Sequence, residues 1–124
     1  MKFASTRLVT NDIEKLIAFY TLLTGTEVTR LAPVFAEFRF EGASLAIPDE
    51  SLVKQFNAGA AVASANRSAI IEFQVDDVDA VQARLGVEAD VAMPPTQMPW
   101  GNRSMLLRDP DGNVVNIFVR PAAQ

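Results

Sequence analysis

The two halves of the sequence repeat the same succession of elements. Asp12-Ile13-Glu14 recurs as Asp77-Val78-Asp79 at an offset of 65 positions, and each triplet opens a segment with helical periodicity. Near the end of each half, Glu41-Gly42-Ala43 recurs as Asp111-Gly112-Asn113 at an offset of 70 positions. A repeat of this length indicates two copies of one supersecondary unit, and it constrains the fold more than any single segment.

The first copy is predicted as a strand, a helix and three further strands. Asn11 is the expected N-cap, with Glu14 in the capping-box position, and Gly25 is the expected end of the helix. The apolar stripe of this helix has the spacing i, i+3, i+4, i+7, and it consists of Ile13, Leu16, Ile17, Tyr20 and Leu23. The expected strands cover residues 2–9, 27–31, 34–41 and 43–47.

The second copy repeats this order. A strand over 68–75 leads into a helix that Asp76 and Asp77 cap and Gly86 ends, and the later strands are expected over 87–91, 102–108 and 114–119. A polar, Ala-rich connector over 48–66 is expected to hold a short helix at 50–56. The prediction is therefore an α+β fold in a single domain over 1–124, made of two βαβββ modules at 1–47 and 67–120.

Composition removes several classes of function. The 124 residues include no cysteine and no histidine, which excludes disulfides, thiolate chemistry, serine–histidine triads and histidine metal sites. The net charge of −4 and the scattered basic residues argue against nucleic-acid binding. With no apolar run of membrane-spanning length and no secretory leader, we expect a cytoplasmic protein that does not enter the membrane.

The last expected strand follows a segment whose residues are all typical of a turn. In Asp109-Pro110-Asp111-Gly112-Asn113, proline presets φ, glycine supplies a positive φ, and the Asp and Asn side chains bond their own backbone. Alternation along the strand then places Asn116 between Val114 and Phe118 on one face. Asn116 is thus a polar side chain on an otherwise apolar face.

Several short motifs in this order resemble the vicinal oxygen chelate family. They are Ile17-Ala18-Phe19-Tyr20 followed by Gly25, Val75-Asp76-Asp77, Pro99-Trp100-Gly101 and the turn at 109–113. The family includes glyoxalase I, extradiol dioxygenases, fosfomycin-resistance transferases and bleomycin-resistance proteins. The resemblance implies two modules that form an open half-barrel cleft.

The resemblance also implies four positions at which enzymatic members hold a divalent metal. In this sequence those positions are Ser5, Ala46, Ile70 and Asn116. Alanine and isoleucine have no donor atom, and neutral serine and asparagine cannot compensate the charge of a divalent cation. We therefore expect no metal and no other cofactor.

Other polar side chains are expected on the same faces. Alternation places Arg7 beside Ser5 and Glu72 beside Ile70, and three interpretations are open: an ion pair between them, two ligand-recognition charges, or Glu72 as a general base whose pKa burial tunes. Tyr20 lies on the helical stripe, which favours a core role over catalysis.

Two residues have one functional and one structural interpretation each. Trp100, the only tryptophan, either presents its indole to a ligand or packs at a strand end or a dimer contact. Asn116 either forms a hydrogen bond with a ligand or forms one with a neighbouring strand or a water molecule.

The expected function is metal-independent binding of a small organic molecule, similar to the bleomycin-resistance branch. One alternative is a metal-free lyase or isomerase that uses Glu72 or Tyr20, and another is a structural interaction module. A homodimer is expected, with or without exchange of modules. The candidate ligand-binding residues are Ser5, Arg7, Ala46, Ile70, Glu72, Trp100 and Asn116.

Overall fold

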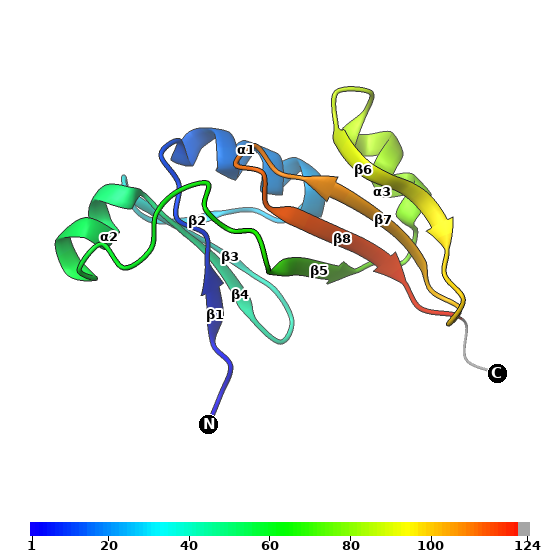
Figure 1. The fold of residues 1–124 in the computed structure, drawn as a ribbon, viewed down its shortest axis with the longest axis horizontal. Helices are drawn as coiled ribbons and strands as arrows, with labels where there is room; N and C mark the ends of the chain where they lie inside the picture. Colours follow the sequence, from blue (N-terminus) through cyan, green and yellow to red (C-terminus); the bar gives the residue numbers. More distant parts are fainter. Residues whose placement is uncertain (122–124) are drawn as a thin grey trace. The chain divides into compact units, whose positions relative to one another are not determined.

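The computed structural model describes residues 1–121, which form two compact units (Figure 1). The first unit covers Met1–Ala65 and the second begins at Asn66. The residues predicted as a connector, 48–66, thus fall almost entirely within the first unit. Each unit contains one four-stranded sheet.

The first unit has six elements in the order strand, helix, three strands, helix. They are β1 (Ser5–Arg7), α1 (Ile13–Thr24), β2 (Thr29–Ala32), β3 (Phe35–Arg39), β4 (Ser44–Pro48) and α2 (Glu50–Phe56). The second unit comprises β5 (Ile70–Gln74), α3 (Val78–Leu85), β6 (Asp90–Gln97), β7 (Arg103–Arg108) and β8 (Val114–Val119). Both units therefore contain the βαβββ order that the repeat predicts.

The two sheets share one topology, β1-β4-β3-β2 and β5-β8-β7-β6. In each sheet the first strand of the module pairs in parallel with the last, and the remaining pairs are antiparallel. A parallel pair needs a long crossover, which the helix and two intervening strands supply. The mixed sheets with their helices confirm the predicted α+β class and the two βαβββ modules.

The core of the first unit forms between α1 and one face of its sheet. The buried residues of α1 are Leu16, Ile17, Tyr20 and Leu23, which is the predicted stripe without the half-buried Ile13. Tyr20 is fully buried, its ring lies 5.0 Å from that of Phe19 and 6.3 Å from that of Phe38, and its core role is thereby confirmed. Burial of these large side chains removes apolar surface from water and stabilises the unit.

The start of α1 differs from the prediction. The N-cap is Asp12, whose carboxylate accepts a hydrogen bond from the Lys15 backbone N–H at 3.1 Å, and Asn11 lies outside the helix. Glu14 is consequently one position too early for a capping box, and its carboxylate pairs with Arg30 instead. Both residues at 11 and 12 suit an N-cap, so propensity alone did not separate them.

Replacement of Asp12 with alanine tests this assignment. We expect the free energy of unfolding to fall by about 1 kcal/mol, because one backbone N–H of the first turn loses its acceptor. Urea denaturation followed by circular dichroism measures the change. Asn11→Ala is the matched control and should alter stability by less than about 0.5 kcal/mol; a larger loss for Asn11→Ala than for Asp12→Ala would contradict the assignment.

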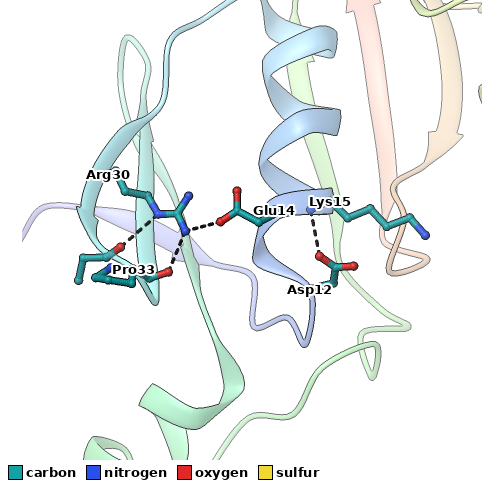
Figure 2. Close-up of polar contacts among 6 residues, drawn as sticks. Asp12, Glu14, Lys15, Arg30 and Pro33 are labelled. Atoms are coloured by element: carbon teal, nitrogen blue, oxygen red, sulfur yellow. Dashed lines mark hydrogen bonds and ion pairs between the residues drawn. The ribbon is translucent and has the colours of Figure 1, made fainter.

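Arg30 connects the first turn of α1 to the turn between β2 and β3 (Figure 2). Its Nη2 donates to Glu14 and to the Pro33 carbonyl at 2.8 Å, and its Nε donates to the Ala32 carbonyl at 3.2 Å. The hydrogen bond from Arg30 lowers the pKa of Glu14, and the same bond raises the pKa of Arg30. One guanidinium thus contacts both the first turn of α1 and the turn between β2 and β3.

The segment after β4 is packed against the first unit. Glu50 N–H donates to the Thr10 carbonyl at 2.9 Å, and Thr10 is fully buried. Val53 of α2 is also buried, and the Glu50 carboxylate accepts from the Ala63 N–H at 2.8 Å. The helix predicted at 50–56 is confirmed and belongs structurally to the first unit.

Several strand boundaries moved from their predicted positions. The first strand is only Ser5–Arg7, and the strand predicted near 87–91 is present as β6 but starts later, at Asp90, because residues 87–88 form a turn. Val87 is fully exposed, so its β-branched side chain reflects no strand burial. The helix before it ends at Gly86 and begins at the N-cap Asp77, both as predicted.

The turn between β7 and β8 is built around a buried carboxylate. Asp109 Oδ1 accepts from the Asp111 and Asn113 backbone N–H groups, both at 2.9 Å, and Oδ2 accepts from Asn113 Nδ2 at 2.7 Å. Asp109 and Asn113 are 4% and 5% exposed, and Gly112 has a φ of 84°. The predicted positive φ of Gly112 and the bonding of Asp109 to the turn backbone are confirmed, whereas the Asn113 side chain bonds the side chains of Asp109 and Asn66.

Candidate functional site

The candidate residues of the second unit meet on the face of its sheet opposite the buried core. Strand register pairs Glu72 of β5 with Asn116 of β8, and Asn116 with Leu106 of β7. Val115 and Ile117 point to the other face, where they are buried. Asn116 and Leu106 are half-buried and Glu72 is exposed, so this face is open beside a polar pair.

Glu72 and Asn116 are joined by a hydrogen bond. Asn116 Nδ2 donates to Glu72 Oε2 at 2.8 Å. Asn116 Oδ1 is buried and has no hydrogen-bond partner among the residues that the structure describes. A buried acceptor without a partner is unfavourable and rare in folded proteins, which marks this amide as unusual.

Apolar and cationic groups border the pair. Ile70 shares the face with Glu72 and is 55% exposed. Phe118 is half-buried, and the Arg120 guanidinium lies 5.5 Å from the centre of its ring. Arg120 Nε also donates to Gln74 Oε1 at 3.1 Å. The face thus combines a carboxylate, an amide and three apolar side chains.

The candidate residues of the first unit also share one sheet face. Register aligns Arg7 with Ala46 and Ala46 with Glu37 across β1, β4 and β3. Ala46 is only 2% exposed, so its methyl group is not accessible to a ligand. Ser5 is exposed and pairs in register with Ser44, not with Ala46.

Arg7 makes its contact within the first unit. Its Nη1 donates to Asn57 Oδ1 at 3.0 Å, and Asn57 is the C-cap residue of α2. Glu37 pairs with Arg39 at 2.7 Å. The ion pair between Arg7 and Glu72 stays a prediction, and each of the two side chains bonds an amide of its own unit.

Glu72 is the residue on which the general-base interpretation depends. The base hypothesis depended on burial of the carboxylate, but Glu72 is exposed. Tyr20 is fully buried in the core, which removes the other candidate for proton transfer to a ligand. The geometry therefore favours a binding role for this pair over proton transfer.

Trp100 lies in the turn between β6 and β7. The turn is closed by hydrogen bonds from Met98 N–H to the Asn102 carbonyl at 2.7 Å and from Gly101 N–H to the Met98 carbonyl at 3.0 Å. Trp100 is 68% exposed, so packing at a strand end does not account for its indole. Presentation to a ligand and contact with a second copy both stay predictions.

The residues at the four positions implied by the family do not fit a metal ion. Ser5 and Ala46 supply one neutral hydroxyl in the first unit, and Ile70 and Asn116 supply one neutral amide in the second. The Asn116 amide already donates to Glu72. Within residues 1–121, no three carboxylates gather closely enough to hold a metal ion. A divalent cation requires several converging, mostly charged oxygens.

Sequence reasoning missed three members of these faces: Leu106, Asn57 and Arg120. Leu106 could have been predicted, because the hairpin turn at 109–113 sets the register that places residue 106 opposite residue 116. Asn57 and Arg120 lie just beyond the ends of elements, where no periodicity indicates the direction of a side chain.

No helix in the described part of the chain has the length and hydropathy needed to cross a membrane.

A pair of βαβββ modules with first and last strands in parallel defines a class of small α+β proteins. A model of the Glyoxalase/Bleomycin resistance protein/Dioxygenase superfamily matches residues 2–117. The chain therefore belongs to this superfamily, which confirms the resemblance. No curated protein matches the sequence significantly.

Solved structures agree with this assignment. A glyoxalase/bleomycin resistance protein/dioxygenase family enzyme from Burkholderia phytofirmans PsJN is 19% identical, with a TM-score of 0.81 over 96% of this chain and 98% of that chain. A glyoxalase-related enzyme from Fulvimarina pelagi is 22% identical, with a TM-score of 0.83 over 97% and 88%. A lactoylglutathione lyase from Agrobacterium tumefaciens is 25% identical, with a TM-score of 0.72 over 94% and 92%.

Proposed function

We propose that the protein binds a small organic molecule without a metal ion. The observation that carries this proposal is the loss of metal-binding side chains at Ser5, Ala46, Ile70 and Asn116 in a chain of this superfamily. An open sheet face with a polar pair and exposed apolar groups supports binding, because organic ligands are held by apolar surface with a few polar contacts. In this respect the protein is similar to the bleomycin-resistance branch.

A ligand screen by thermal unfolding tests the proposal. We expect at least one class of compound to raise the melting temperature in a concentration-dependent manner, because a ligand of the native state stabilises it by mass action. The rise should be the same with and without a strong chelator such as EDTA. No stabilisation by any compound, or a rise that the chelator abolishes, would overturn the proposal.

The similarity to a lactoylglutathione lyase raises a second candidate, a lyase that works without a metal ion. Although the exposure of Glu72 favours binding, Glu72 is the carboxylate of the described face, and this candidate would use it as the base. Turnover of a thiohemiacetal that survives the chelator and is lost in Glu72→Gln would support this candidate. Stabilisation by ligands in the absence of turnover would favour binding alone.

A further inference from the structure

The polar pair on the open face of the second unit combines an exposed carboxylate with a buried, unsatisfied amide oxygen. The hydrogen bond from Asn116 Nδ2 to Glu72 Oε2 uses a donor of the amide, and within residues 1–121 Asn116 Oδ1 has no hydrogen-bond partner. A carboxylate has only acceptor oxygens, and an amide oxygen is likewise an acceptor. A ligand that satisfies both groups must therefore bring N–H or O–H donors.

The charge of Glu72 is not neutralised by an ion pair. None of the ion pairs found within residues 1–121 includes Glu72, and its bond from Asn116 is with a neutral group. Arg120, which follows β8, instead donates to Gln74 and lies over the ring of Phe118. The side chain is exposed, so its negative charge is available to a ligand.

The apolar neighbours define the rest of the ligand. Ile70 offers exposed surface on the β5 side of Glu72, and Leu106 lies opposite Asn116 on the β7 side. A flat apolar body beside the charged group would cover this surface. Burial of such surface removes apolar area from water and complements the polar contacts.

We propose, building on the metal-independent binding function above, that the ligand is an organic cation with N–H donors attached to an apolar body. An amidinium or a protonated amine has the required charge and donors. One N–H would donate to Glu72 and a second to Asn116 Oδ1, which reaches the surface when the amide rotates about χ2, a soft torsion; this rotation gives up the Asn116–Glu72 bond, and the ligand donors replace it. The net charge of −4 attracts cations to the protein as a whole and adds to this preference.

Benzamidine, benzamide and benzoate form a probe series of one shape and three charge states. We expect titration of 15N-labelled protein to show saturable shifts of the Asn116 side-chain amide with benzamidine. Binding of benzamide and benzoate should be at least about tenfold weaker, because a charge-assisted hydrogen bond is replaced by a neutral one or by repulsion. Weak binding by benzamidine is sufficient, since only the order within the series is tested.

Glu72→Gln keeps the shape of the side chain and removes its charge, so it should weaken benzamidine binding by about tenfold or more. Glu88→Gln is the matched control: Glu88 is also exposed, lies in the turn before β6, and should leave binding unchanged. Glu72→Lys should reverse the order and favour benzoate. The amide spectrum of each variant verifies that the fold is retained.

The outcomes separate this inference from the function on which it rests. If ligands of other classes stabilise the protein while benzamidine binds no better than benzoate, the cation preference is wrong and metal-independent binding stands. An unchanged benzamidine affinity in Glu72→Gln would equally overturn the assignment to this pair. If no compound of any charge binds, both the inference and the proposed function are wrong.

Discussion

Substitution of Phe38 with alanine is expected to lower the free energy of unfolding by about 3–5 kcal/mol. Phe38 is fully buried on the face of β3 that packs in the core of the first unit. Its ring lies 6.3 Å from that of Tyr20 and 6.3 Å from that of Phe40, to which it is nearly parallel at 8°. Truncation would remove these contacts and leave a cavity, because the surrounding strands cannot collapse fully.

Urea denaturation followed by far-ultraviolet circular dichroism measures this loss. Phe56→Ala is the matched control, because Phe56 ends α2 with 71% of its surface exposed. The control should change stability by less than about 0.5 kcal/mol. Equal losses in the two variants would contradict the position of the core, since the same atoms are removed in both.

The second large effect is expected from Asp109→Ala, which should destabilise the protein by about 2–4 kcal/mol. The Asp109 carboxylate accepts three hydrogen bonds, from the Asp111 N–H, the Asn113 N–H and Asn113 Nδ2. Asp109 and Asn113 are both buried, so the donors of Asn113 would lose their acceptor in a place that water does not reach. Hydrogen bonds to a charged group are stronger than neutral ones, and their loss costs more.

Asp109→Asn separates charge from geometry at this position. One amide oxygen can still accept the two backbone bonds at Oδ1, but the amide nitrogen would face Asn113 Nδ2, donor against donor. We therefore expect an intermediate loss, between that of Asp109→Ala and that of Glu88→Ala, an exposed control. A loss for Asp109→Asn as small as for the control would show that the carboxylate is not required.

The sequence predicted the modules well because apolar periodicity and caps are local signals. The α1 stripe and the ends of α3 at Asp77 and Gly86 were read correctly, and so was the turn at 109–113. The errors fall where two neighbours suit one role, as with Asn11 and Asp12, or where β-branched residues such as Val87 lie in a turn. Such choices depend on tertiary contacts that propensity does not contain.

Only part of the candidate site could be predicted from the sequence. Alternation identified Asn116 as a polar side chain on an apolar face, and it placed Glu72 on the corresponding face of another strand. Their pairing follows from the parallel register of β5 and β8. This register depends on the packing of α3, β6 and β7, which separate the two strands in the sequence. Hairpin register is set locally by a turn, whereas parallel register is set by the whole crossover.

The topology also has a consequence for synthesis of the chain. β8 lies in the interior of its sheet, between β5 and β7, although it is the last strand to be made. As the ribosome releases the second unit, β5 has no strand partner within that sheet until Val119 has emerged. Until then its backbone N–H and C=O groups form hydrogen bonds with water. A nascent chain halted before Val114 would therefore expose the edge of β5, and a holdase chaperone would have its best opportunity to bind at that stage of translation.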